Sequence, residues 1–388
     1  MRRLIVCADG TWNKDEEQAD GGGRTNVAYV KANIAASDRA GVPQRVFYDR
    51  GVGTGNFLDR WFGGAFGNGI ERNIRDDCYG FLVREFQPGD ELFFFGFSRG
   101  AFTVRSLAGM VRKCGIIRRS PGKSPGDPLD ERERKLIADA YRFYRERGDA
   151  SHPSGPRATE FRKANSHESM IKCLCVWDTV GSLGVPTSGP AGMISRRRHA
   201  FHDVKLSSHV RNGFHALAVD ERRKPFAPSL WEIPDDDPAL RSGGWRIEQR
   251  WFAGVHSNVG GGYPDRGLSH LALRWMIEKA QECGLEFAPG FHEAVHPECR
   301  CAGVRCDSMT LFYRLFGQHE RPIGADLQDA RKRRLLTFEE VDSSVPERCC
   351  LPELGDVDRQ TGYRPANFLA YWARHPHLFG GKYKRPER

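Results

Sequence analysis

The sequence predicts an α/β protein, with a mostly parallel sheet and helices on both of its faces. Short apolar runs alternate along the chain with amphipathic segments, which is the order expected when a crossover helix follows each strand. The run at 171–177 is almost continuously apolar, as in a strand that is buried on both faces. The sequence shows no internal repeat that would favour another architecture.

The expected elements follow from these patterns in chain order. Strands are predicted at 4–8, 45–48, 91–95, 171–177 and 247–255, and a further strand at 214–219 is an alternative. Helices are predicted where apolar residues recur on one face, at 70–86, 101–111 and 268–279. Three segments look like insertions of loops and helices, at 51–69, 118–154 and 184–209, and the second contains a charged helix at about 130–147.

The length of 388 residues allows one large domain or two modest ones. Because the pattern degrades into loops and short helices near residue 290, we expect a main α/β domain at 1–290 and a peripheral region at 291–388 packed on it. The 39% hydrophobic content supports a real core.

The eleven cysteines suit a reducing compartment, and the N-terminal apolar stretch is too short for a signal peptide. The chain is therefore expected to be cytoplasmic as synthesised, although export without a signal peptide stays compatible with the sequence.

The most informative motif lies where the strand at 91–95 ends. Gly96-x-Ser98-x-Gly100 joins this strand directly to a helix. A nucleophilic serine needs such a turn, because flanking glycines let the chain bend sharply and expose the hydroxyl. The backbone N–H of Arg99 would then lie at a helix start, where an oxyanion is stabilised. The alternative is a tight glycine turn in an α/β protein without this chemistry.

A catalytic serine needs a base and an orienting acid, which follow it in the order serine, acid, histidine in such folds. Asp178 closes the strand at 171–177, and His256 closes the strand at 247–255. Asp220 is a rival acid at the end of 214–219, and Asp178 could instead cap a helix. The rival histidines are His202, His209, His215 and His270.

Asp9-Gly10-Thr11 forms a polar turn after the first strand, at the sheet edge where α/β active sites form. Its backbone amides at Gly10 and Thr11 could supply a second oxyanion donor, although Asp9 could equally be a structural turn residue. Cys299, Cys301 and Cys306 match no closed zinc pattern. We therefore predict no metal and no cofactor.

Six ordered motifs together resemble one family. They are CADGTWN at 7–13, GVGTG at 51–55, GFSRGAFTVRSLAG at 96–109, VWDTVGSLG at 176–184, HALAVDERR at 215–223 and FAGVHSNVGGGY at 252–263. This set resembles the α/β-hydrolases long described as a domain of unknown function, which include the first class of type VI secretion lipase effectors. The resemblance implies an α/β-hydrolase fold, a triad of Ser98, Asp178 and His256, and phospholipase A-type hydrolysis. Asn258 departs from the aspartate that the family commonly has there.

The leading hypothesis is a serine esterase that acts on a lipid ester, most naturally a glycerophospholipid. The net charge of +9 and the aromatic residues Trp61, Phe62 and Phe66 would suit an anionic membrane surface. The family resemblance adds a secretion-system or immunity partner. One alternative is a soluble ester or thioester hydrolase of housekeeping metabolism. Another is a non-enzymatic module that binds protein or nucleic acid, but a nucleic-acid partner is not expected.

Overall fold

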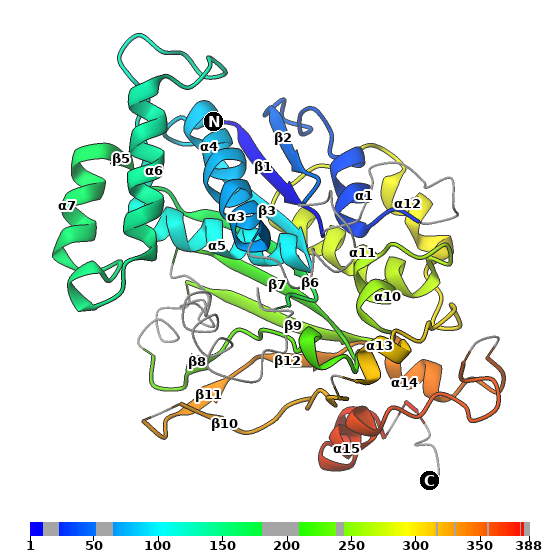
Figure 1. Ribbon diagram of the computed structural model, residues 1–388. Coiled ribbons are helices and arrows are strands. Elements are labelled where there is room, and N and C mark those ends of the chain that lie inside the picture. Colours follow the sequence, from blue (N-terminus) through cyan, green and yellow to red (C-terminus); the bar gives the residue numbers. More distant parts are fainter. Residues whose placement is uncertain are drawn as a thin grey trace.

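The computed structural model describes residues 1–10, 23–51, 65–180, 209–237, 244–315, 317–329, 331–354, 357–380 and 382–383. Seven parallel strands form the central sheet in the order β12-β9-β7-β6-β3-β1-β2, with helices on both faces (Figure 1). This α/β-hydrolase-like architecture confirms the predicted fold class. The strands are β1 (Arg3–Ala8), β2 (Gln44–Asp49), β3 (Glu91–Phe97), β6 (Ile171–Trp177), β7 (Asn212–Ala218), β9 (Arg246–Phe252) and β12 (Glu339–Val341).

The order of the strands reverses beside β1. The chain runs from β1 to β2 on one side, then returns to β3 on the other side and continues outward to β9. At such a reversal the loops after the two central strands diverge, which opens a ligand site at the carboxyl ends of the strands. Asp9 follows β1 and Ser98 follows β3, so both residues lie at this position.

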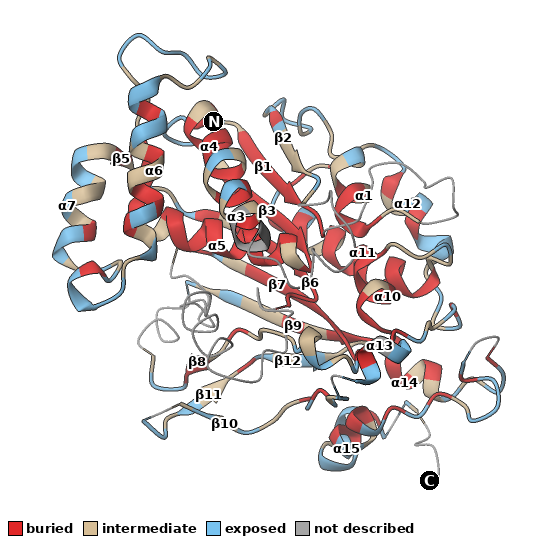
Figure 2. Cartoon of the chain, in the orientation of Figure 1, coloured by how far each residue is buried: buried red, intermediate tan, exposed pale blue. Residues whose placement is uncertain are grey.

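Alternating side chains of the central strands feed two separate cores. Ile5 and Phe93 belong to the core under α1 (Asn26–Asn33) and α11 (Gly267–Glu282). Leu4 and Phe94 belong to the core on the opposite face. The helices that cover this second face are α3 (Ala65–Arg72), η1 (Asn73–Tyr79), α4 (Gly80–Glu85), α5 (Arg99–Cys114) and α6 (Glu131–Arg145). Both faces of the central strands are therefore buried, as Figure 2 shows, which explains their nearly unbroken apolar sequence.

The predicted helix at 70–86 contains a π-helical stretch, η1, between α3 and α4. Its buried residues recur every four positions, and in an α-helix such a stripe rotates by about 40° at each step. The wider turn of a π-helix offsets this rotation. Ile74, Cys78 and Leu82 accordingly all reach the same core. The same four-residue spacing is also typical of an amphipathic α-helix, so the sequence alone predicted a helix here and not its π-helical stretch.

The second predicted insertion contains α6, which confirms the charged helix, and also α7 (Pro156–Asn165) with the short strands β4 (Ile116–Ile117) and β5 (Ser166–His167). Most of the other two insertions, including Trp61 and Phe62, lies outside the described residues. The division at residue 290 stays a prediction. The structure shows that β12, from beyond that point, is the edge strand of the main sheet.

The remaining elements of the chain are short. A small antiparallel sheet joins β8 (Ile233–Pro234), β11 (Arg334–Leu336) and β10 (Leu327–Gln328). The helices of this part are α10 (His256–Gly260), α12 (Phe291–Val295), α13 (Leu311–Arg314), α14 (Ser344–Cys349) and α15 (Ala366–Arg374), with the 3₁₀ turns η2 (Asp149–Ser151), η3 (Lys224–Phe226), η4 (His296–Glu298) and η5 (Pro376–Leu378). No helix within the described ranges is long and apolar enough to cross a membrane.

Candidate active site

Ser98 occupies a sharp turn between β3 and α5. Its φ of 56° lies in the left-handed region, which is costly for any residue except glycine. The two flanking glycines allow the close packing of this turn. A Cβ at Gly100 would collide with the Ala8 carbonyl, and a Cβ at Gly96 would collide with the start of α5. Ser98 also donates its backbone N–H to the Trp177 carbonyl at 3.1 Å. The sequence motif therefore folds into the strained geometry that a nucleophile elbow requires.

The structure brings His256 and Asp178 together. His256 is the first residue of α10 and Asp178 directly follows β6, and the distance from His256 Nδ1 to Asp178 Oδ2 is 2.6 Å. Both side chains are buried. Since a carboxylate accepts, Nδ1 carries the proton and the tautomer with a basic Nε2 is favoured. This is the arrangement of an acid that orients a catalytic base.

Two aromatic rings fix the imidazole of His256. Phe97, which immediately precedes Ser98, has its ring centroid 4.7 Å from that of His256. Phe226 approaches edge-on at 5.0 Å. Burial lowers the pKa of His256 below its ordinary value, although Asp178 opposes the shift. The base is consequently neutral, and able to accept a proton, at neutral pH.

Asp220, the rival acid, has a different set of partners. Its Oδ2 accepts hydrogen bonds from the Gly254 N–H at 2.6 Å and from the Tyr363 hydroxyl at 2.8 Å. Burial raises the pKa of this carboxyl. Within the described part of the chain, Asp220 thus stabilises the turn before His256, whereas Asp178 contacts the imidazole itself.

The turn after β1 is held by its own carboxylate. Asp9 is buried and accepts hydrogen bonds from the Gly10 N–H, Thr25 Oγ1 and Tyr48 Oη at 2.7, 2.5 and 2.8 Å. This favours the structural interpretation of Asp9. The Gly10 amide is already engaged, so its predicted use as an oxyanion donor would require this bond to break. Thr11 lies outside the described residues.

The Arg99 amide is better placed to stabilise an oxyanion. Arg99 is the first residue of α5, and the first turn of a helix directs its N–H groups outward along the axis. The same end of the helix carries the positive end of the dipole. An anion that forms on the substrate beside Ser98 would therefore meet this amide first.

Burial lowers the pKa of each of the other candidate histidines within the described residues. His215 accepts the Thr179 N–H at Nε2 and lies 3.0 Å from Gln249 Oε1 through Nδ1, and burial lowers its pKa to about 3. His270 lies in α11, where burial lowers its pKa to about 4. Burial also lowers the pKa of His209, and His202 lies outside the described residues. His256 is the histidine that Asp178 contacts.

Three charged residues near His256 and Asp178 were not singled out as site residues in the sequence. Glu221 is buried and accepts the His256 N–H at 3.2 Å, while Arg223 pairs with it at 2.8 Å. Arg321 donates to both oxygens of Asp178, at 2.6 and 3.0 Å. Glu221 adjoins Asp220 in the motif at 215–223, which could have indicated it. Nothing in the sequence around Arg321 indicates that it contacts Asp178.

Comparison with known proteins gives the family. A family model described as the catalytic domain of type VI secretion (T6SS) Tle1-like phospholipase effectors matches residues 2–279. The chain belongs to this family. A curated relative, the uncharacterized protein YEL023C of Saccharomyces cerevisiae, is 22% identical over 431 residues, which cover 76% of this chain and 58% of the relative. The chain thus spans well under two thirds of that relative's length.

Two solved structures also resemble this Tle1-like chain. An uncharacterized protein from Pseudomonas aeruginosa matches with a TM-score of 0.43 and 18% identity, over 77% of this chain and 48% of the other. The Tle1 effector bound to the VgrG spike of the type VI secretion system matches with a TM-score of 0.39 and 15% identity, over 87% and 88% of the two chains.

The side chain of Asn258, where the resemblance led us to expect an aspartate, is engaged in hydrogen bonds in this Tle1-like chain. The Asn258 side chain donates to the Val304 carbonyl at 3.0 Å and accepts from the amides of Val255 and Cys306 at 3.3 and 3.2 Å. An aspartate could not make the first of these bonds. The amide therefore ties the turn that carries His256 to the segment at 304–306. Across the described residues, no group of three or more His, Cys, Asp and Glu side chains is arranged to hold a metal.

Proposed function

We propose that this protein is a serine phospholipase of the A type, which hydrolyses a carboxylic ester of a glycerophospholipid. The observation that carries the proposal is the combination of the Ser98 elbow with the 2.6 Å contact between His256 and Asp178. Membership in the Tle1-like phospholipase family supports the choice of a lipid ester.

In the proposed mechanism, Ser98 Oγ attacks the ester carbonyl while His256 Nε2 takes its proton. Asp178 holds the Nδ1 proton and stabilises the imidazolium that forms. The Arg99 N–H donates to the developing oxyanion, a contact typically worth about 3 kcal/mol in the transition state. The imidazolium then protonates the leaving lysophospholipid alkoxide. In the second step His256 takes a proton from water, which attacks the acyl-Ser98 ester, and returns it to Ser98 Oγ as the fatty acid leaves.

An apolar surface beside the site supports a lipid surface as the partner. Leu311 and Leu315 are each 83% exposed, at α13 and just after it. Tyr313, between them, is buried and packs against Phe226, whose ring contacts His256. The exposed Arg314 adds positive charge for anionic headgroups. This surface would dock the site onto a membrane; the predicted secretion-system partner stays a prediction.

The test is hydrolysis of mixed anionic and zwitterionic phospholipid vesicles, with products resolved by mass spectrometry. We expect wild type to release fatty acid and lysophospholipid, and Ser98→Ala to release neither. Ser106→Ala is the matched control, because it removes a buried hydroxyl from the same helix, where the hydroxyl donates only to the Phe102 carbonyl. Cleavage of a soluble ester without any lipid hydrolysis would replace the phospholipase with a metabolic esterase.

A further inference from the structure

Arg321 makes a two-pronged contact with the carboxylate of Asp178. Its Nη1 donates to Oδ1 at 2.6 Å and its Nη2 donates to Oδ2 at 3.0 Å. The remaining Nη hydrogens go to the carbonyls of Ala218 at 2.9 Å and Phe226 at 2.5 Å. The guanidinium is only 1% exposed, so solvent hardly screens this pair. Such a planar fork fixes the plane of a carboxylate as well as its position.

The loop that carries Arg321 is itself anchored by α15. Asn367 bridges the carbonyls of Arg321 and Val219, at 3.1 and 2.9 Å. Arg374, at the other end of α15, donates to the carbonyls of Ile323 and Gly324, at 2.6 and 3.0 Å. These bonds hold both ends of the segment at 321–324.

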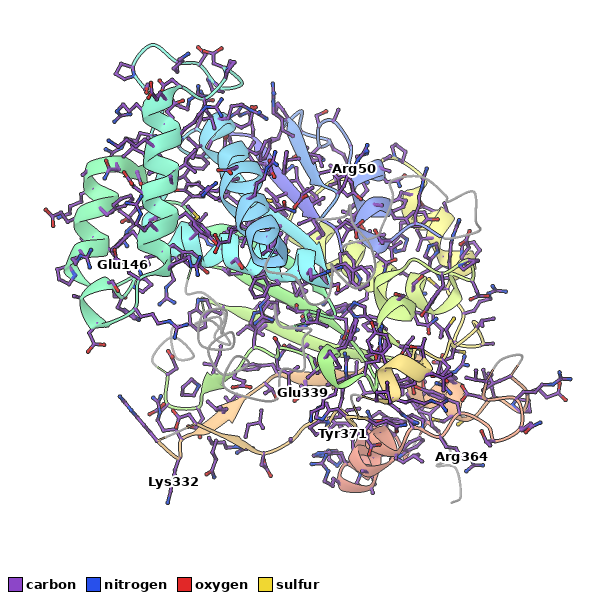
Figure 3. The ribbon with its side chains drawn as sticks, viewed as in Figure 1. Arg50, Glu146, Lys332, Glu339, Arg364 and Tyr371 are labelled. Atoms are coloured by element: carbon purple, nitrogen blue, oxygen red, sulfur yellow. The ribbon has the colours of Figure 1, made fainter. Side chains whose placement is uncertain are left out.

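The edge strand β12 holds the same loop from a second side. Gly324 donates its N–H to Glu339 Oε2 at 3.2 Å, and the Tyr371 ring leaves no room for a Cβ at Gly324. Figure 3 labels Glu339 and Tyr371 close together where β12 and α15 meet. Arg321 is therefore held beside Asp178 by hydrogen bonds with α15 and β12, two elements that lie beyond the family match at residues 2–279.

We propose that Arg321 is a positioning residue of the catalytic triad, which locks the Asp178 carboxylate in the plane needed to orient His256. This inference rests on the proposed function. It implies that the segment at 2–279 contains the triad but depends on a residue beyond it, Arg321, to orient the Asp178 carboxylate. Burial alone would raise the pKa of Asp178, but Arg321 and His256 together hold it well below its usual range, so the acid stays ionised.

The distinguishing experiment compares two lysine substitutions. Arg321→Lys keeps the charge but loses the planar fork. Arg348→Lys is the matched control, because Arg348 is also fully buried and has the same kinds of partner. It donates to the carbonyls of Cys301 and Gly303 and to the carboxylate of Asp358. We measure kcat and KM for the soluble ester p-nitrophenyl butyrate, together with thermal unfolding.

We expect R321K to lose kcat by on the order of 10- to 100-fold, as when a residue that orients a catalytic ligand is removed. Its KM should stay within about twofold of wild type, because the substrate does not contact Arg321. R348K should keep kcat even if it unfolds at a lower temperature. An equal loss of kcat in R348K, or a kcat within about twofold of wild type in folded R321K, would overturn the proposal.

A second readout separates this proposal from the proposed function. The proton that His256 Nδ1 shares with Asp178 gives a downfield ¹H NMR resonance that needs no substrate, and His256→Ala assigns it. We expect R321K to shift or broaden this resonance and R348K to leave it unchanged. If wild type hydrolyses no ester but R321K, unlike R348K, perturbs the resonance, the proposed function fails and the positioning role stands. If the resonance is unchanged in R321K, the positioning role is refuted.

Discussion

The carboxylate of Asp178 and the imidazole of His256 lie 2.6 Å apart, although 78 positions separate them in the chain. Asp178 follows β6 and His256 follows β9, and β7 lies between these strands in the sheet. The intervening strand contributes as well, because the Ala218 N–H donates to Asp178 Oδ1 at 3.0 Å. The parallel order of the sheet is what gathers these groups at one edge.

The first prediction separates the two candidate acids. Asp178→Asn should lower kcat by about 10⁴-fold, because the amide favours the wrong histidine tautomer. Asp220→Asn should keep kcat within about threefold, since an amide oxygen can still accept from Gly254 and Tyr363. The measurement is kcat on p-nitrophenyl butyrate, corrected for the folded fraction by circular dichroism. If Asp220→Asn alone abolished turnover, the acid would be assigned to Asp220.

The second prediction concerns pH. His256 acts as a base only when it is neutral, and burial lowers its pKa. Activity should therefore rise with pH through a midpoint below about 6.5, the ordinary histidine value. Glu221 opposes the shift through its charge, and Arg223 adds to it. Glu221→Gln should consequently move the acid limb of kcat/KM to still lower pH.

The control for this pH profile is Glu232→Gln, which removes a carboxylate whose neighbouring charge is Arg105. Its acid limb should coincide with that of wild type. An acid limb that moved upward in Glu221→Gln would contradict the assignment of His256 as the titrating base.

Much of the fold could be predicted from the sequence because burial leaves a local signal. The strands that precede Ser98 and Asp178 are largely apolar, and the polar residues that follow them mark one edge of the sheet. The strand before His256 gives a weaker signal, because Arg246, Glu248, Gln249 and Arg250 make up most of β9. The edge strand β12 has no such signal, since Glu339 and Glu340 make up most of its three residues. Its identity as a strand comes from pairing with β9, which depends on the tertiary fold.

The site could be predicted in part for the same reason. Asp178 and Asp220 both follow strands, so only their positions in space show which one reaches His256. Arg321 precedes a proline in a polar stretch and resembles any surface arginine in the sequence. Its burial and its contact with Asp178 arise from packing against residues more than a hundred positions away.

The third prediction replaces Asn258 with aspartate, the residue expected there from the family resemblance. Asn258→Asp should destabilise the protein by about 1–3 kcal/mol, because the Val304 carbonyl loses its donor and faces a carboxylate oxygen. Chemical denaturation at pH 7 measures this loss. Asn258→Ser, which also loses the amide but adds no charge, should be less destabilised. Equal stability of Asn258→Asp and wild type would show that the segment at 304–306 is held by other contacts.

The last prediction tests the membrane-facing surface. Leu311 and Leu315 bury little of their surface in the folded protein, so the double variant Leu311→Ser/Leu315→Ser should unfold like wild type. Burying a leucine contributes roughly 1.5–3 kcal/mol, so partial insertion of both leucines would strengthen membrane binding. We therefore expect the double variant to lose vesicle hydrolysis by on the order of 10- to 100-fold. Hydrolysis of p-nitrophenyl butyrate should not change. Leu378→Ser, at an exposed leucine beyond α15, is the control and should affect neither substrate. If the double variant lost both activities equally, the leucines would act on the site itself and not on its contact with lipid.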